Sequence, residues 1–163
     1  MSIVKKVQSY LEIGGANVMV TRLDDSSLAE SKSGDMSRRK LTANASRADI
    51  FVSIHQNSFN SSSVRGAQVF YFNESDNSKK LAVSIQSQLK EFADPTNKFL
   101  PKPNDKYFVL KQTAMPAVIV ECGFLSNAAE RKKLSTDEYQ EQIAWAIYAG
   151  IVDYFDSEEA QMS

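Results

Sequence analysis

Two residues of this chain combine a chemically useful side chain with a position directly after a short apolar segment. His55 follows residues 50–54, and Glu121 follows residues 117–120. An imidazole suits a metal ligand or a general base, and burial beside apolar residues raises the pKa of a carboxylate toward that of a general base. Functional groups collect beyond the carboxyl ends of parallel strands. If the two segments are parallel strands, we expect His55 and Glu121 at the same edge of a sheet.

Three neighbouring features have plainer explanations. Cys122 is a candidate nucleophile, but the chain has no second His to activate it, and a free Cys is commonly a small buried hydrophobic residue. Asn57 either orients a ligand or shapes a turn, and we favour the turn. The basic cluster at residues 37–40 either contacts an anionic polymer or forms the solvated start of a helix, and we favour the helix.

The composition restricts the class of protein and the kind of metal site. One His and one Cys among 163 residues exclude an internal disulfide, a Cys-rich zinc site and any site with two His from this chain. A metal site is therefore expected to be carboxylate-rich or incomplete. The formal net charge of −1 argues against nucleic-acid binding through the overall field. No apolar run reaches the roughly 18–20 residues of a membrane span, and the first residues do not resemble a signal peptide.

The spacing of apolar residues predicts alternating helices and strands in one domain of residues 1–163. Gly14 and Gly15 are expected to end the first helix, and Leu41 and Ala45 to form the inner face of the second. The expected helices cover residues 2–13, 36–46, 76–92, 127–134 and 137–155, and the expected extended segments cover 16–22, 50–54, 67–72, 107–110 and 117–120. This alternation predicts an α/β fold, a three-layer sandwich with a mostly parallel central sheet flanked by helices. The helix over 2–13 and the strand over 16–22 form the second half of a βαβ unit whose first strand is not in the sequence.

Several motifs resemble zinc-dependent N-acetylmuramoyl-L-alanine amidases. Residues 48–57, ADIFVSIHQN, are similar to the family's apolar strand ending in S-I-H-x-N. Residues 115–127, MPAVIVECGFLSN, are similar to its specific signature around E-x-G-F. Residues 20–22, 66–72 and 132–155 agree with the family in order and spacing. The polar loop that ends in residues 37–40 also resembles a sporulation and germination subgroup that acts on spore cortex.

The resemblance implies hydrolysis of the amide that joins N-acetylmuramic acid to L-alanine in peptidoglycan, outside the cytoplasm in cell wall or spore cortex. It implies a Zn²⁺ ion held by two His and one Glu, with a further Glu that takes a proton from water. By position, His55 matches the second His ligand and Glu121 the catalytic Glu. The family's other two ligands precede the segment that matches Met1, so we expect an incomplete zinc site and a fold that lacks the family's first strand.

The sequence leaves more than one function open. The interpretation that we favour is an N-terminally truncated amidase domain with impaired activity, because His55 and Glu121 are both retained. The alternative is a non-catalytic protein that binds cell wall or another partner. A hydrolase that uses Cys122 or Glu121 without a metal is a third interpretation. Peptidoglycan is the expected partner, and the sequence does not predict whether an activator protein takes part.

Overall fold

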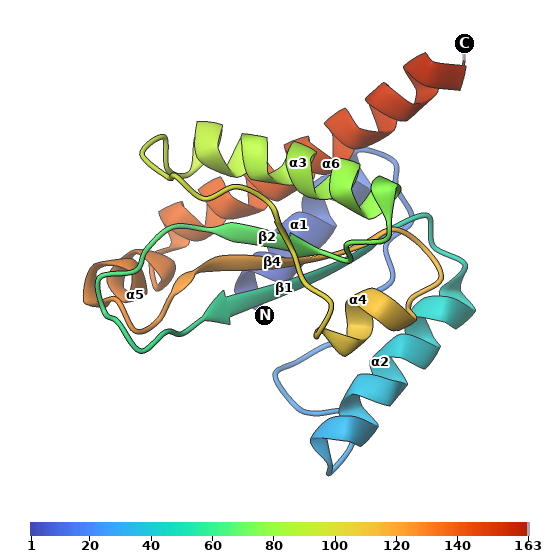
Figure 1. Cartoon of the computed structure of the whole chain (residues 1–163), viewed down its shortest axis with the longest axis horizontal. Coiled ribbons are helices and arrows are strands. Elements are labelled where there is room, and N and C mark those ends of the chain that lie inside the picture. The colour runs from blue at the N-terminus through green and yellow to red at the C-terminus, as the bar shows by residue number, and fades with distance from the viewer. Residues whose placement is uncertain (163) are drawn as a thin grey trace.

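The central feature of the molecule is a four-stranded sheet with helices on both faces (Figure 1). The computed structural model describes residues 1–162 of the chain. Within them the elements, in chain order, are α1 (Ser2–Ile13), α2 (Lys32–Ser46), β1 (Phe51–Asn57), β2 (Gln68–Tyr71), α3 (Asp76–Phe92), β3 (Lys102–Pro103), α4 (Phe108–Gln112), β4 (Ala117–Phe124), α5 (Ala128–Leu134) and α6 (Asp137–Met162). No helix in this part of the chain is long and apolar enough to cross a membrane.

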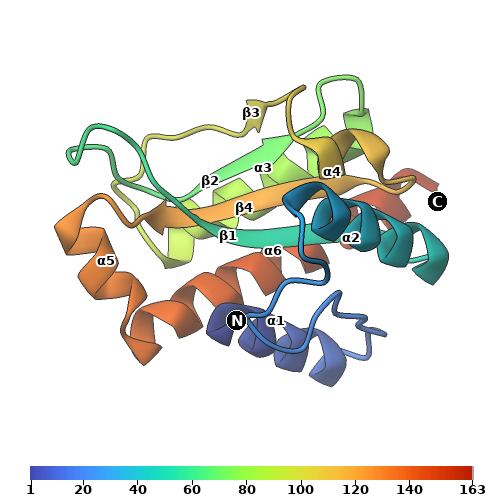
Figure 2. The same ribbon diagram turned by 90° about the horizontal axis from the view of Figure 1, so that it is seen from below.

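The strands lie in the order β1-β4-β2-β3. The pairs β1/β4 and β2/β3 are parallel, whereas β2 and β4 are antiparallel. The sheet is therefore mixed, with parallel pairing predominating, and the predicted α/β fold is confirmed. Figure 2 shows the sheet between α1 and α6 on one side and α2 and α4 on the other.

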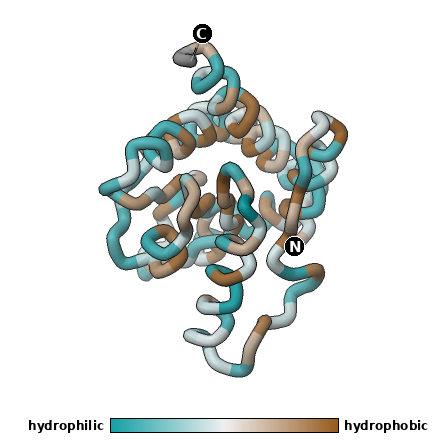
Figure 3. The backbone as a smooth tube through the Cα atoms, turned by 90° about the vertical axis from the view of Figure 1, so that its right-hand side faces the viewer, coloured by the Kyte–Doolittle hydropathy of each residue, from teal (hydrophilic) through white to brown (hydrophobic). Residues whose placement is uncertain are grey.

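Alternation along the strands produces two separate cores. One face carries Val69 and Tyr71 of β2 into the large cluster formed with α1, α3 and α6. The other face carries Phe70 into a smaller cluster against α4, where Phe72 is only partly buried. This division matches the alternation predicted for residues 67–72, because successive side chains of a strand point to opposite faces. Figure 3 shows that the C-terminal end of α6 projects beyond the rest of the fold and that its last turns are largely hydrophilic.

The Gly pair ends α1 as predicted. Gly15 has a φ of 88°, and its N–H donates to the carbonyl of Glu12, while the N–H of Ala16 donates to the carbonyl of Leu11. These two bonds form a Schellman motif, which requires a left-handed residue just beyond the helix. The prediction of a strand over residues 16–22 is wrong, because the structure has irregular backbone there. A strand needs a neighbour for its ladder hydrogen bonds, and this segment pairs with none of the described strands.

The inner face predicted for the second helix is also wrong. Leu41 is 62% exposed and Ala45 is exposed, whereas Asp35 and Ala43 are buried. The Asp35 carboxylate accepts hydrogen bonds from the backbone N–H of Leu28 and from the Arg39 guanidinium. An ion pair and a loop contact therefore orient α2 where an apolar stripe was expected. The helix begins at Lys32 rather than at residue 36, so the basic cluster at 37–40 lies inside it.

Residues 107–110 were expected to be extended, but Phe108 begins α4. The Asn104 side-chain oxygen accepts hydrogen bonds from the backbone N–H groups of Lys106 and Tyr107, which turns the chain into the helix. A short apolar run such as this one is compatible with a strand or with a buried turn of helix. The hydrogen bonds of Asn104 decide between them.

Candidate active site

The pairing of β1 with β4 places His55 directly beside Glu121. On the other side of β4, Gln68 of β2 is the register partner of Glu121. Because register partners share a face of the sheet, the three side chains form a row across three strands. The prediction that His55 and Glu121 lie together near the carboxyl ends of two parallel strands is confirmed. The strands continue to Asn57 and Phe124, so both residues lie within strands rather than just beyond them.

Glu121 is a buried carboxyl group with an unsatisfied oxygen. The residue is 8% exposed, and its Oε2 atom has no hydrogen-bond partner in the described part of the chain. It follows Ala117 and Ile119 on the face of the smaller core. Burial raises the pKa of Glu121 to about 7, because removal of water disfavours the charged form. A carboxyl group that is half ionised near neutral pH suits proton transfer.

One ring nitrogen of His55 takes part in a hydrogen bond. Its Nε2 atom lies 2.9 Å from the hydroxyl of Ser53, two residues earlier on the same face of β1. Burial lowers the pKa of His55, and the positive charges of Arg39 and Arg22 lower it further. Neutral imidazole is the form that binds a metal ion or accepts a proton. The hydrogen bond to Ser53 leaves Nδ1 as the second ring nitrogen for either task.

Cys122 and Asn57 have structural roles. Cys122 is fully buried in the large core on the opposite face of β4 from Glu121, and burial raises the pKa of its thiol. A protonated thiol without access to substrate does not act as a nucleophile. The Asn57 side-chain oxygen accepts a hydrogen bond from the N–H of Ser58, so it shapes the turn after β1, as predicted.

Glu130 organises the end of the sheet beside the site, and the sequence analysis missed it. Its carboxylate oxygens accept hydrogen bonds of 2.8 Å from the backbone N–H groups of Gly66 and Phe124. These bonds tie the segment before β2 to the end of β4. A signal was present, since Asn127 and Glu130 have the spacing of a capping box. The Asn127 side chain does cap α5, but the Glu130 side chain accepts from the N–H groups of Gly66 and Phe124 instead of that of the N-cap.

The described residues do not fit a complete zinc site. In residues 1–162, no three His, Cys, Asp or Glu side chains lie close enough together to hold a metal ion. His55 and Glu121 are adjacent, but catalytic zinc normally takes three protein ligands and a water molecule.

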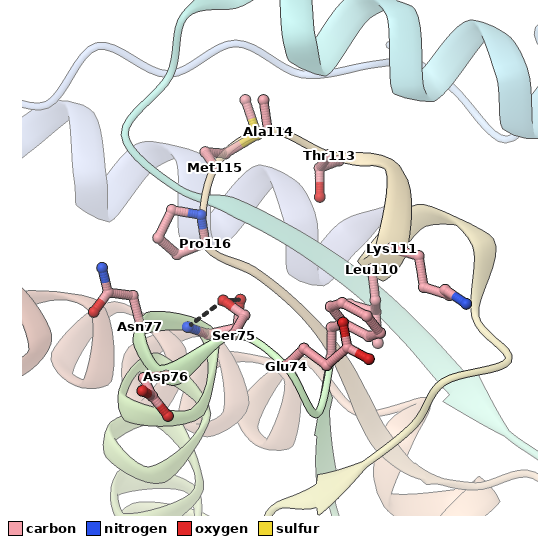
Figure 4. Close-up of a pocket in the computed structure, with 12 residues that line it drawn as sticks. Glu74, Ser75, Asp76, Asn77, Leu110, Lys111, Thr113, Ala114, Met115 and Pro116 are labelled. Carbon is pink, nitrogen blue, oxygen red and sulfur yellow. Dashed lines mark hydrogen bonds between the residues drawn. The ribbon is translucent and has the colours of Figure 1, made fainter.

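A separate hollow with a volume of about 460 Å³ lies at the start of α3 (Figure 4). Glu74, Ser75 and Asp76 face Lys111 and Pro116 across it. Pro116 precedes β4, whereas Glu121 lies five residues further along the chain, which is about 16 Å in an extended strand. This hollow is therefore at the opposite end of the sheet from the row of His55, Glu121 and Gln68.

The sequence of this chain is similar to those of known amidases. The sequence profile described as N-acetylmuramoyl-L-alanine amidase matches residues 1–153. The germination-specific N-acetylmuramoyl-L-alanine amidase of Bacillus subtilis (strain 168) is 32% identical over an alignment of 163 positions. The alignment covers 95% of this chain and 68% of that protein. The amidase LytC of the same organism is 31% identical over 95% of this chain, which spans only 30% of LytC.

Solved structures show the same fold. The CwlD amidase from Clostridioides difficile, in complex with the GerS lipoprotein, has a TM-score of 0.91 and 41% identity, over 96% of this chain and 84% of that one. An N-acetylmuramoyl-L-alanine amidase from Clostridium difficile 630 has a TM-score of 0.85 and 32% identity, over 96% and 81% of the two chains.

Proposed function

This chain belongs to the N-acetylmuramoyl-L-alanine amidase family. We propose that it hydrolyses the amide between N-acetylmuramic acid and L-alanine in peptidoglycan, with Glu121 as the catalytic residue. The observation that carries the proposal is the buried Glu121 carboxylate, with an unsatisfied oxygen and a pKa of about 7, beside the imidazole of His55. Peptidoglycan is the substrate of amidases with this description. The domain that carries the activity is residues 1–163.

Glu121 performs both proton transfers of the reaction. Ionised Glu121 takes a proton from water while the water oxygen bonds to the carbonyl carbon of the amide. The protonated carboxyl group then gives that proton to the amide nitrogen as the carbon–nitrogen bond breaks. Glu121 returns to its ionised form, and the products are the lactyl carboxylic acid and the amino group of L-alanine. The acid then passes its proton to the amine, which leaves a carboxylate and an ammonium group.

His55 is the residue that we propose as a ligand of a zinc ion. Zinc is the cofactor that the family resemblance implies, and when bound it polarises carbonyl groups and lowers the pKa of water. The described residues offer one imidazole for it, that of His55. We expect low activity of the 163-residue chain for this reason.

We propose the place of action and a protein partner from the names of similar proteins. Similar proteins are named as germination-specific and cell wall amidases, which supports action outside the cytoplasm, on cell wall or spore cortex. The similar CwlD structure contains the GerS lipoprotein, which supports a protein partner for this chain as well.

A second candidate function is binding of peptidoglycan without hydrolysis. The absence of a three-residue metal cluster within residues 1–162 favours it. The two candidates differ in what they require of Glu121, since binding of a polymer does not need a general base.

The test is release of stem peptides from purified peptidoglycan sacculi, detected by mass spectrometry as new amino-terminal L-alanine. Glu121→Gln is compared with Glu74→Gln, a matched change at an exposed carboxylate near the distant hollow. We expect Glu121→Gln to lower the rate at least about 100-fold and Glu74→Gln to leave it unchanged. Equal rates in the wild type and Glu121→Gln refute the catalytic assignment. Retention of both proteins on sacculi without release supports the binding function instead.

A further inference from the structure

The Tyr107 side chain lies on the same face of the sheet as Glu121. Tyr107 is the N-cap of α4, which covers that face (Figure 2), and its ring packs against the smaller core. The ring centroid lies 5.6 Å from that of Phe70, with the two ring planes at 88°. Phe70 is the register partner of Ile119, two residues before Glu121 on β4. Residues two apart in a strand share a face, so Phe70 is about 7 Å along the sheet from the row that contains Glu121.

The hydroxyl of Tyr107 is a hydrogen-bond donor close to the Glu121 carboxyl group. Burial raises the pKa of the Tyr107 hydroxyl, and the negative charge of Glu121 raises it further. The hydroxyl is therefore protonated at neutral pH and can donate. It makes no hydrogen bond within residues 1–162, although a buried tyrosine hydroxyl usually has a partner.

Two polar groups without partners are therefore close neighbours. The Oε2 atom of Glu121 has no partner in the described part of the chain, and the Tyr107 hydroxyl does not bond to it. Gln68, the register partner of Glu121 on β2, donates its amide nitrogen to the carbonyl of Leu100 instead. Polar groups without partners are rare in protein interiors. A ligand that accepts from the hydroxyl while it reacts beside the carboxyl group accounts for both.

The backbone of Tyr107 is held on both sides, which fixes the position of its hydroxyl. Its N–H donates to the side-chain oxygen of Asn104 at 3.1 Å, and its carbonyl accepts from the N–H of Leu110 at 3.2 Å. The N–H of Asn104 donates to the carbonyl of Tyr71, at the end of β2. These bonds tie the segment before α4 to the sheet that carries Glu121. A donor held in this way needs no rearrangement when charge develops beside it.

The charged side chains near the site lie on the side of His55. Burial alone raises the pKa of Glu121, and no Lys or Arg of residues 1–162 contributes to the shift. Burial also lowers the pKa of His55, and the charges of Arg39 and Arg22 lower it further. Among the described side chains, the donor beside Glu121 is therefore a neutral hydroxyl rather than a cation.

We propose that Tyr107 is a second catalytic residue, whose hydroxyl donates a hydrogen bond to the oxygen of the amide that this chain hydrolyses. As the water oxygen bonds to the carbonyl carbon, Glu121 takes the water proton and an electron pair moves from the carbonyl bond to the amide oxygen. The hydrogen bond stabilises this negative oxygen, and Tyr107 keeps its proton throughout. The electron pair returns to the carbonyl bond when the carbon–nitrogen bond breaks. The inference rests on the proposed function, because it concerns the same amide and the same general base.

The first test compares Tyr107→Phe with Tyr148→Phe in the hydrolysis of a soluble N-acetylmuramoyl tripeptide. Tyr107→Phe removes only the hydroxyl and keeps the ring against Phe70. Tyr148→Phe makes the same change in a ring that packs against Tyr10 of α1, on the other face of the sheet. We expect Tyr107→Phe to lower kcat about 100-fold and to raise KM by less than about tenfold. We expect Tyr148→Phe to leave both unchanged, and thermal unfolding of the variants is measured alongside.

The second test measures binding and does not depend on turnover. The tripeptide and its thioamide, in which sulfur replaces the oxygen of the scissile amide, are titrated calorimetrically into Glu121→Gln with and without Tyr107→Phe. We expect loss of the hydroxyl to weaken binding of the amide about threefold or more. We expect it to leave binding of the thioamide unchanged, because sulfur is a weak hydrogen-bond acceptor. The paired change of residue and ligand isolates this one contact.

The outcomes separate this inference from the proposed function. Equal kcat in the wild type and Tyr107→Phe, together with a lower kcat in Glu121→Gln, overturns the role of Tyr107 and leaves that of Glu121 standing. Equal weakening of both ligands by Tyr107→Phe also overturns it, because the hydroxyl then contacts another part of the substrate. Equal kcat in all variants, or no binding of either ligand, overturns both proposals. Where turnover is too slow to measure, the calorimetric comparison decides.

Discussion

Replacement of Glu121 by Gln is expected to change the pH dependence of stability as well as the activity. The ordinary pKa of this carboxyl group is 4.5, and burial raises it to about 7 in the folded chain. Below pH 4.5 the group is protonated in both states and contributes nothing to the pH dependence. Between pH 4.5 and 7 the unfolded chain loses the proton while the folded chain keeps it, so the free energy of unfolding falls as the pH rises. Above pH 7 the full penalty is present.

The size of the effect follows from the two pKa values. At 1.36 kcal/mol for each pKa unit, the penalty at pH 8 is at most about 3 kcal/mol, and contact with solvent reduces it. Gln does not ionise, so the variant lacks the penalty. The difference between variant and wild type is therefore expected to increase by about 2–3 kcal/mol from pH 4.5 to pH 8. Packing changes caused by the amide group cancel in this comparison, because they are present at both pH values.

The assay is urea unfolding of the wild type, Glu121→Gln and Glu74→Gln at pH 4.5, 6 and 8, followed by circular dichroism. Glu74 is exposed, so its variant is expected to follow the wild type at every pH. If Glu121→Gln and wild type differ by the same amount at all three pH values, the folded carboxyl group has its ordinary pKa. That result removes the argument that burial prepares Glu121 for proton transfer.

Further predictions concern the site and its support. Hydrolysis is expected to rise with pH up to about 7 and then to level off, because Glu121 must be ionised; a flat profile of rate against pH from 5 to 8 contradicts this. Glu130→Ala leaves two buried N–H groups without acceptors and is expected to cost about 2–5 kcal/mol in urea unfolding, whereas an unchanged midpoint contradicts the role given to its carboxylate. Gly150→Ala places a Cβ atom 2.5 Å from the Cα of Ile85 and is expected to cost about 1–3 kcal/mol, measured as a lower Tm. Leu41→Lys is expected to change stability by less than about 0.5 kcal/mol, since that side chain is exposed.

Motifs and periodicity predicted α1, α3 and the adjacency of His55 and Glu121. The helix over residues 76–92 agrees with α3 (Asp76–Phe92), because its apolar spacing is local and Ser75 caps its first turn. His55 and Glu121 were predicted to meet because each follows an apolar run, and the register of β1 with β4 confirms it. Glu130 was not predicted, because its two partners lie 64 and 6 residues away in the chain. Periodicity along the sequence does not reveal a carboxylate whose partners are backbone N–H groups of other segments.

The sequence by itself determined the elements whose stability is local, such as the Gly15 end of α1, and it made His55 and Glu121 the candidate site residues. The tertiary structure alone decided whether an extended pattern becomes a strand. Residues 16–22 have the composition of a strand but lack a paired neighbour, whereas residues 117–124 have neighbours on both sides and form the longest strand. The tertiary structure also decided the pKa of Glu121, because desolvation depends on what surrounds the carboxyl group in space. Ladder hydrogen bonds and burial depend on contacts between segments that are distant in the sequence. A sequence pattern can therefore predict them but not establish them.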